Sequence, residues 1–392
     1  MSVQTNAEPP ELSVVMPCLN EADTLESCLR KAQQAAQAHG IVTEVIVADN
    51  GSTDESRAIA LRLGARVVEV EQKGYGAALM GGIAAANGTY IIMGDADDSY
   101  DFGEIPRFVE RLREGYDLVQ GCRLPRGGGR VLPGAMPFLH RWIGNPMFTI
   151  LARLWFGSPL ADVYCGLRGF TKRFYMQLNQ RCIGMEFATE MIIKASLFHG
   201  RMAEVPITLH PDRRRTHAPH LRTFRDGWRT LRFYLMYSPR WLFFLPGTAL
   251  VLLGMVGAAI ALPTTTINGV TFTAHTLLFS CLAILIGYQA ILFAIFTKVF
   301  AIAEGLMPED PRLTRLFKVI NLEKGLIAGA VALVVGVALL GSVVNQWRLS
   351  HFGNLEYGET MRVVISGATL TALGVQTLLG SFFASILGTR RK

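Results

Sequence analysis

Short apolar runs and longer helix-like stretches alternate in the front part of the chain. Four strands are predicted by apolar, β-prone runs at residues 12–16, 43–48, 66–70 and 90–93. Three helices are predicted between them, at residues 24–38, 55–63 and 74–86. Strands that alternate with helices are typical of a mostly parallel sheet. We therefore expect an α/β domain whose ligands bind at the carboxyl ends of the strands.

Two later stretches mix apolar residues with arginine. Residues 133–159 are rich in Phe, Leu, Trp and Met, but Arg141 and Arg153 make the stretch too charged to span a bilayer. We expect an interfacial or core helix pair there. In residues 222–235, four arginines recur at helical spacing and apolar residues recur on a different side. That pattern predicts an amphipathic helix on a membrane surface, the alternative being the solvated face of a core helix.

The rest of the chain contains four apolar stretches of bilayer length, at residues 241–262, 275–300, 325–347 and 363–387. The loop at residues 301–324 and the C-terminal tail are basic, whereas the loop at residues 263–274 carries no charge. The positive-inside rule therefore places both chain ends and the middle loop in the cytoplasm. The predicted parts are a polar tail (1–11), a cytoplasmic α/β domain (12–211), a basic interfacial segment (212–240) and a four-helix transmembrane domain (241–392).

Charge and cysteine content narrow the function classes. The 392-residue chain has a formal net charge of +7, and between Asp212 and Arg240 it holds eight arginines and two aspartates. A basic cluster beside an apolar span suits anionic headgroups or phosphates. The sequence contains no recognised nucleic-acid-binding motif, so we expect no nucleic-acid partner. The six cysteines form no Cys-x-x-Cys pair and residues 1–11 contain no apolar signal region, which predicts reduced thiols on the cytosolic side.

Asp95-Ala96-Asp97 directly follows the strand predicted at residues 90–93. Two carboxylates one residue apart at a strand end supply the oxygen donors that Mg²⁺ or Mn²⁺ prefers. A cation there would bridge diphosphate oxygens and take up charge as a leaving group departs. Asp-x-Asp also occurs in many surface turns, so this motif alone does not decide the function.

Four motifs follow one another on successive strand ends: Met16-Pro17-Cys18-Leu19-Asn20-Glu21, Ala48-Asp49-Asn50-Gly51-Ser52-Thr53-Asp54, Lys73-Gly74-Tyr75-Gly76-Ala77-Ala78 and Asp95-Ala96-Asp97. In this order the chain resembles the family-2 glycosyltransferases, and within them the dolichol-phosphate mannose or glucose synthase branch and its bacterial polyprenyl-phosphate relatives. The resemblance covers roughly residues 12–210. It implies a single nucleotide-diphosphosugar domain of the GT-A type. It also implies inverting transfer of a hexose from a UDP- or GDP-sugar to a polyprenyl phosphate at the membrane.

The resemblance further implies roles for single residues on the donor side. The expected nucleotide-binding residues are Pro17, Asn20, Glu21, Asp49, Asp95 and Asp97. Of these, Asp49 would contact the base or ribose, Asp95 and Asp97 would hold the metal, and Asp97 is also counted as catalytic. Plainer roles stay open: Asn20 as a helix cap, Asp54 as a turn residue, and the glycines of the third motif as sites of close packing.

The resemblance also implies that two arginines bind the acceptor phosphate. Gln120-Gly121-Cys122-Arg123 resembles the family's Gly-Ser-Arg segment, whose arginine faces the acceptor phosphate, and Arg141 falls where a second phosphate-binding arginine is expected. Both are expected to be catalytic. A phosphate acceptor is already ionised at neutral pH, so the site needs arginines to position it rather than a strong base. Asp162 and Arg168 match another family segment, but an ion pair that holds a loop explains them as well.

Two departures from the family pattern affect the expected site. Ser99 stands where the dolichol-phosphate branch commonly has a glutamine, so it is the third candidate metal ligand. The family's later Arg-x-x-Gly-x-Ser-Lys segment is replaced by Arg213-Arg214-Arg215-Thr216-His217, whose register is open. Within this run we expect Arg215 and His217 to reach the diphosphate.

Two other functions stay open from the sequence. A processive polysaccharide synthase carries a Gln-x-x-Arg-Trp segment; here Arg141-Trp142 is present, but Phe138 stands at the glutamine place. A non-catalytic membrane scaffold with a transferase-like domain is the other alternative, and the intact acidic motifs argue against it.

Overall fold

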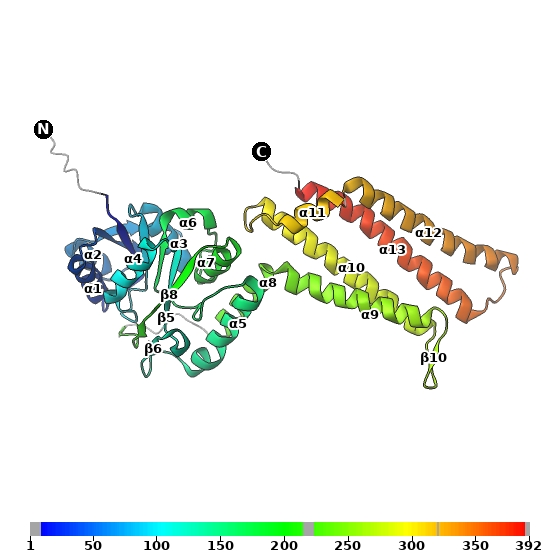
Figure 1. The fold of residues 1–392 in the computed structure, drawn as a ribbon, viewed down its shortest axis with the longest axis horizontal. Helices are drawn as coiled ribbons and strands as arrows, with labels where there is room; N and C mark the ends of the chain where they lie inside the picture. Colours follow the sequence, from blue (N-terminus) through cyan, green and yellow to red (C-terminus); the bar gives the residue numbers. More distant parts are fainter. Residues whose placement is uncertain (1–8, 215–222, 320, 389–392) are drawn as a thin grey trace. The chain divides into compact units, whose positions relative to one another are not determined.

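The structure is a computed structural model that describes residues 9–214, 223–319 and 321–388. The chain divides into two compact units between Tyr237 and Ser238 (Figure 1). The first unit contains the α/β domain, and the second contains the long apolar helices.

Seven strands form the central sheet of the first unit, in the order β3-β2-β1-β4-β7-β5-β8. They are β1 (Leu12–Cys18), β2 (Thr43–Asp49), β3 (Arg66–Glu69), β4 (Tyr90–Met93), β5 (Leu118–Cys122), β7 (Arg168–Thr171) and β8 (Met202–Pro206). β7 runs antiparallel to its neighbours β4 and β5, and the other neighbouring strands are parallel. The predicted mostly parallel α/β sheet is thus confirmed. A short parallel pair, β6 (Arg130–Val131) with β9 (Thr208–Leu209), forms a separate small sheet.

Helices cover both faces of the central sheet. Side chains alternate between the faces along each strand, so Val14 and Met16 of β1 join one core cluster and Val15 joins the other. The first cluster is completed by α1 (Leu25–Ala38), α2 (Ser56–Arg62) and α4 (Ile105–Arg113). The second is completed by α3 (Tyr75–Ala85), α5 (Asn145–Phe156), α6 (Lys172–Leu178), α7 (Glu186–Leu197) and α8 (Thr223–Met236). Because both faces are covered, the strand ends are the part of the sheet that a ligand can reach.

The second unit is built from α9 (Leu245–Ala261), α10 (Ala274–Ala303), α12 (Leu322–Leu349) and α13 (Tyr357–Gly388). A π-helical turn, η4 (Arg240–Phe244), runs directly into α9. Four helical segments among the described residues are long and apolar enough to cross a membrane, and they correspond to the four predicted spans. Within this unit, α9 packs on α10, α10 on α13, and α13 on α12.

Shorter elements connect the long helices. Between α9 and α10, a turn at Asn268 and Gly269 joins β10 (Thr266–Ile267) to β11 (Val270–Thr271). Both turn residues have positive φ, as a tight hairpin turn requires. Between α10 and α12 lies α11 (Pro311–Val319).

Of the two arginine-containing stretches before the spans, the first differs from expectation and the second forms the predicted helix. Residues 133–159 contain one continuous helical segment rather than the predicted helix pair, because a π-helical turn, η3 (His140–Gly144), runs directly into α5, which ends at Phe156. The amphipathic helix predicted within residues 212–240 is α8, which belongs to the first unit. Its Phe233 and Tyr234 are buried in the second core cluster, and the Tyr234 hydroxyl donates to the Phe148 carbonyl oxygen of α5 at 3.3 Å. Apolar packing therefore attaches α8 to the domain.

Gly74 and Gly76 let the loop at residues 182–184 pack directly on the start of α3. Gly74 has a φ of +139°, and a Cβ atom there would lie 2.2 Å from the Ile183 carbonyl oxygen. A Cβ atom on Gly76 would lie 2.3 Å from the Cys182 carbonyl oxygen. Close packing therefore requires glycine at both positions, and it fixes where Tyr75, between them, begins the helix.

Gly76→Ala is predicted to destabilise the first unit, because the new methyl group meets backbone and the Phe187 Cβ, which lies 2.8 Å away. We expect a loss of about 1–3 kcal/mol in the free energy of unfolding. A thiol-reactive dye that labels the buried cysteines on heating would measure it. Gly227→Ala in α8 is the matched control, since open space surrounds that position, and it should unfold at the same or a slightly higher temperature. Equal shifts for the two variants would contradict the packing described here.

Candidate active site

Parallel pairing brings the carboxyl ends of β1, β2 and β4 to one edge of the sheet. Cys18 at the end of β1 is in register with Asp49 at the end of β2. The segments that follow β1 and β4 are also in contact, since Thr24 Oγ1 donates to the Ala96 carbonyl oxygen at 2.6 Å. The first, second and fourth sequence motifs therefore meet in space, as the strand pattern predicts.

Asn20 connects the first motif to the second. Its side-chain oxygen accepts a hydrogen bond from the Thr53 backbone nitrogen at 2.8 Å, and its backbone has a left-handed φ of 60°. Asn20 is not the cap of α1, whose N-cap is Thr24. Asp54 accepts from the Ser56 backbone nitrogen at 3.0 Å, which is the turn role left open above. A nucleotide contact by Asn20 stays a prediction.

Asp49 is almost fully buried at the end of β2, with 1% of its surface exposed. Its carboxylate accepts hydrogen bonds from the backbone nitrogens of Gly51 and Ser52 and forms an ion pair with Arg57 at 2.6 Å. Burial alone would raise the pKa of Asp49, but these contacts outweigh it and lower the pKa. Pro17, partly exposed, lies on the adjacent strand β1. Contact of Pro17 and Asp49 with a nucleotide stays a prediction.

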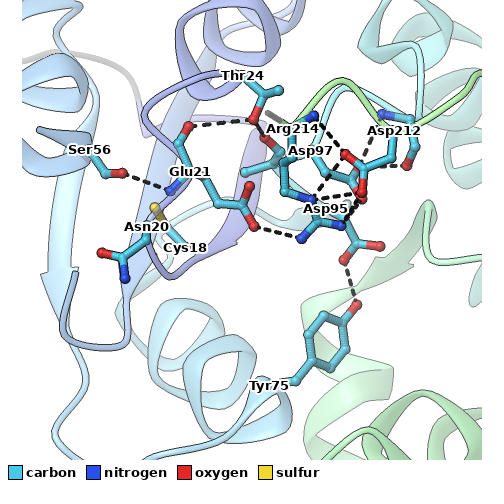
Figure 2. A network of polar contacts seen from close by, with 12 residues as sticks. Cys18, Asn20, Glu21, Thr24, Ser56, Tyr75, Asp95, Asp97, Asp212 and Arg214 are labelled. Carbon is cyan, nitrogen blue, oxygen red and sulfur yellow. Dashed lines mark hydrogen bonds and ion pairs between the residues drawn. The ribbon is translucent and has the colours of Figure 1, made fainter. Parts of the chain in front are cut away.

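The Asp95-Ala96-Asp97 motif lies just beyond the end of β4. Asp95 Oδ1 accepts a hydrogen bond from the Tyr75 hydroxyl at 2.9 Å (Figure 2). Asp97 Oδ1 accepts from the Ser99 hydroxyl at 2.5 Å and from the Ser99 backbone nitrogen at 3.0 Å. Burial, together with the negative charge of Asp97, raises the pKa of Asp95 to about 6. In this structure Ser99 orients Asp97, and its role as a metal ligand stays a prediction.

Arg214 joins the acidic side chains of this edge. Its guanidinium nitrogens lie 3.1 Å from Glu21 Oε1, 3.0 Å from Asp97 Oδ2 and 2.7 Å from Asp212 Oδ2 (Figure 2). Burial opposes its charge, but the carboxylates outweigh burial and hold the pKa of Arg214 above its ordinary value. Arg214 was one of several arginines in the basic run, and the sequence contained no signal that singled it out.

The register of the basic run comes from a backbone contact. The Arg213 backbone nitrogen donates to the Asp97 carbonyl oxygen at 3.4 Å, which places the next residue, Arg214, against the acidic motif. The residues expected to reach the diphosphate, Arg215 and His217, lie outside the described residues, so their role stays a prediction.

The donor set at this edge suits a hard divalent cation that shares a diphosphate. Within residues 9–214, 223–319 and 321–388, no three His, Cys, Asp or Glu side chains stand together as a complete metal site. Asp95 and Asp97 offer two carboxylates, and Mg²⁺ is commonly held by one or two carboxylates plus substrate phosphates. The ion pair with Arg214 shows that the Asp97 carboxylate binds a cationic group in this structure. The residues therefore fit Mg²⁺ or Mn²⁺ whose coordination a diphosphate completes.

Arg123 and Asp162 form a buried, two-pronged ion pair. Arg123 Nε donates to Asp162 Oδ2 at 2.7 Å and Nη2 donates to Oδ1 at 2.8 Å. Burial would raise the pKa of Asp162, but the arginine outweighs it and lowers the pKa. Arg168 is fully buried and donates to the carbonyl oxygens of Cys165 and Val163. The ion pair that holds this loop is therefore Arg123–Asp162 rather than one between Asp162 and Arg168. Phosphate contact by Arg123 stays a prediction.

Arg141 lies on η3, ahead of α5. Its guanidinium carbon lies 5.4 Å from the centre of the Trp142 ring, and the residue is partly exposed, whereas Arg123 is 7% exposed. Of the two arginines expected to face an acceptor phosphate, Arg141 is the more accessible, and its contact stays a prediction.

Two family models match this chain. The model of glycosyl transferase family 2 matches residues 13–178, and that of the glycosyltransferase family 2 C-terminal transmembrane region matches residues 295–388. The low-salt glycan biosynthesis hexosyltransferase of Haloferax volcanii is 37% identical over 381 residues, which cover 97% of this chain and 89% of that protein. The chain belongs to glycosyltransferase family 2. It is a membrane enzyme in which a GT-A-type domain precedes transmembrane helices.

Other relatives of this family-2 glycosyltransferase match about half of it. The dolichyl-phosphate hexose transferase of Haloferax volcanii is 30% identical, and the match covers 55% of this chain and 89% of that protein. The undecaprenyl-phosphate 4-deoxy-4-formamido-L-arabinose transferase of Klebsiella pneumoniae is 31% identical, and the match covers 52% of this chain and 60% of that protein. A crystal structure of glucosyl-3-phosphoglycerate synthase from Mycobacterium tuberculosis, in complex with Mg²⁺ and UDP, is 22% identical, with 58% of this chain and 79% of that chain covered and a TM-score of 0.45.

Asp162→Asn in the family-2 glycosyltransferase is predicted to leave the Arg123 charge buried without a carboxylate, at a cost of about 3–5 kcal/mol in the free energy of unfolding. Because folding lowers the pKa of Asp162, its stabilisation is present above the unfolded pKa of about 3.9 and is lost as the pH falls through the lower folded value. The thermal midpoint at pH 7, and its fall on acidification, would measure both effects.

The matched control for Asp162→Asn is Glu26→Gln, which removes the carboxylate from exposed ion pairs with Arg30 and Arg62. It should unfold nearly as the parent does, because water screens exposed pairs. A thermal midpoint for Asp162→Asn equal to that of the control would refute the structural role of the buried pair.

Proposed function

We propose that this family-2 glycosyltransferase moves a hexose from a UDP- or GDP-sugar to a polyprenyl phosphate, with inversion at the anomeric carbon. The observation that carries the proposal is the group of carboxylates bridged by Arg214 at the sheet edge, in a chain with four membrane-length helices. A polar edge suits a sugar nucleotide, and membrane helices in the same chain suit a lipid acceptor. The relatives named for dolichyl phosphate and undecaprenyl phosphate support a polyprenyl phosphate in particular.

On the donor side, Asp95 and Asp97 would hold the Mg²⁺ or Mn²⁺, which when bound supplies positive charge to the diphosphate oxygens. Glu21 and Asp49 flank the same edge and orient the nucleotide. Arg214 adds a planar donor group of the kind that pairs bidentately with phosphate. These residues place the diphosphate so that its negative charge is balanced as the bond to the sugar breaks.

On the acceptor side, an oxygen of the lipid phosphate attacks the anomeric carbon from the face opposite the departing nucleoside diphosphate, which inverts the configuration. The phosphate is ionised at neutral pH, so orientation by arginine replaces proton removal by a base. Arg141 is favoured for the direct contact because it is partly exposed. Arg123, whose Nε and Nη2 are engaged by Asp162, orders the loop on that side of the site.

The first unit also exposes an apolar surface suited to a bilayer interface. Along η3, the residue before it and α5, exposed apolar side chains recur at helical spacing: Leu139, Trp142, Ile143, Met147, Ile150 and Leu154. α8, which packs against α5, exposes Phe224 and Trp228 together with Arg225 and Arg229. Apolar side chains beside arginines suit a surface with anionic headgroups. Only residues 237–239 separate α8 from the first membrane-length segment, so the end of α8 lies within a few residues of that segment along the chain.

The distribution of basic residues supports a cytoplasmic active site. The loop between α10 and α12 carries Arg312 and Arg315 among its cations, whereas the connection at residues 263–274 is uncharged. Basic loops stay in the cytoplasm. With four spans, the first unit and the C-terminal end then share that side, where nucleotide sugars are the natural donors.

Asp97→Asn is predicted to lower sugar transfer about a hundredfold or more, because the substitution removes a charge that would hold the cation at the diphosphate. The assay follows label from a nucleotide sugar into an organic-extractable, mild-acid-labile lipid in membranes that contain the full chain. Glu110→Gln, an exposed carboxylate on α4, is the control and should keep full activity. Lipid labelling by Asp97→Asn at the parental rate would exclude this mechanism.

A variant with both Ile150→Ser and Leu154→Ser is predicted to raise the KM for the lipid acceptor roughly tenfold while leaving the KM for the nucleotide sugar unchanged, because it removes apolar area that enters the interface. The two positions are 52% and 62% exposed, so folding should be preserved. Leu61→Ser on α2, at a position 65% exposed, is the control that should change neither KM. An unchanged acceptor KM in the double variant would show that this face does not meet the lipid.

A further inference from the structure

The chain segment that carries Arg214 is bound along the acidic loop by its backbone. Leu209 forms an antiparallel bridge with Tyr100, the His210 backbone nitrogen donates to the Ser99 carbonyl oxygen at 2.9 Å, and Arg213 contacts Asp97 in the same way. The segment thus runs antiparallel to residues 97–100. Arg214 follows directly, so its side chain is delivered to Asp97 by main-chain pairing.

Both oxygens of Asp97 are engaged in this arrangement. Oδ1 accepts the two hydrogen bonds from Ser99, and Oδ2 accepts the one from Arg214 Nη2 at 3.0 Å. The Arg214 side chain is 11% exposed and reaches Glu21 and Asp212 as well. A divalent cation that binds Oδ2 of Asp97 would therefore share that oxygen with the guanidinium.

Two cations on one carboxylate repel each other, and the repulsion is strong where water is scarce. A diphosphate changes this balance, because it brings negative oxygens that a metal ion and a guanidinium can both bind. The same arginine that opposes the metal in the nucleotide-free enzyme would then support the metal complex once the nucleotide is present. By linkage, the nucleotide would also bind more tightly in the presence of the metal.

We propose that Arg214 is a built-in competitor of the divalent cation for Asp97, so that the free enzyme binds metal weakly and nucleotide binding moves the guanidinium from Asp97 to the diphosphate. This inference rests on the proposed metal site at Asp95 and Asp97. It assigns Arg214 as the residue that couples metal binding to nucleotide binding, rather than as a fixed structural partner of the acidic loop.

The test is titration of Mn²⁺ into the purified full-length protein, with free Mn²⁺ measured by electron paramagnetic resonance, with and without UDP. Arg214→Gln is expected to tighten nucleotide-free Mn²⁺ binding roughly tenfold, as loss of a competing ion pair worth about 1.4 kcal/mol would. The gain in Mn²⁺ affinity caused by UDP should shrink correspondingly. Arg214→Lys should fall between the parent and Arg214→Gln, since a single ammonium replaces the planar guanidinium.

Arg213→Gln is the matched control, because it removes the same positive charge at the neighbouring position. The Arg213 side chain is 64% exposed and pairs with Asp98 at 3.2 Å. It should leave Mn²⁺ affinity nearly unchanged. Equal tightening in Arg213→Gln and Arg214→Gln would overturn the competition and leave only a general charge effect. The competition would also be overturned if Arg214→Gln and Arg214→Lys bound Mn²⁺ no more tightly than the parent. A thermal midpoint equal to that of the parent would show that each variant is folded.

Asp97→Asn separates this inference from the proposed function. If the parent binds Mn²⁺ in the presence of UDP and Asp97→Asn does not, the metal site stands, and the Arg214 variants decide the competition alone. If the parent binds no Mn²⁺ even with UDP, the metal site itself fails and the competition fails with it.

Discussion

Carboxylates gathered at one edge of a sheet must be balanced by cations, and the structure of this site follows from that constraint. Parallel strands bring the acidic side chains together because their carboxyl ends share an edge. The carboxylates in contact with Arg214 are Glu21, Asp97 and Asp212. Asp95, close by, has its pKa raised to about 6 by burial and by Asp97. An edge with this excess of negative charge suits a divalent cation, and in the proposed function the metal and the arginine would together hold the diphosphate.

A second buried ion pair acts indirectly on Asp95, which lies just beyond the end of β4. Glu190 and Lys194 of α7 are fully buried and lie 2.7 Å apart, and Glu190 Oε2 accepts hydrogen bonds from the backbone nitrogens of residues 181 and 182. That loop packs on Gly74 and Gly76, which sets the start of α3. Tyr75, at the start of α3, donates to Asp95. The buried Glu190–Lys194 pair therefore helps to orient the Asp95 carboxylate through the loop at residues 181–184 and the start of α3, because close packing holds each of these parts in place.

The division of the chain into a polar site and an apolar anchor matches the chemistry of the proposed substrates. A sugar nucleotide is water-soluble and highly charged, whereas a polyprenyl phosphate keeps its chain in the bilayer and presents only its phosphate. The exposed apolar face of α5 and the arginines of α8 belong to the first unit, so the domain itself has a surface suited to the proposed contact with a bilayer interface. Anchoring needs only one span, so four membrane-length helices, packed in the order α9, α10, α13 and α12, exceed what anchoring alone requires.

The sequence by itself determined the layout: alternating strands and helices, four spans, and acidic motifs on successive strand ends, because periodicity and apolar length report local structure directly. The predicted helix pair at residues 133–159 was wrong because the π-helical turn η3 carries the chain past Gly144 and Pro146 into α5 without a break. Only the tertiary structure decided that Arg123 pairs with Asp162, and that Arg214 reaches Asp97 while its neighbour Arg213 pairs with Asp98. Identical residues in one run differ only in the direction of their side chains, and that direction comes from pairing between segments more than a hundred residues apart, which no local pattern encodes.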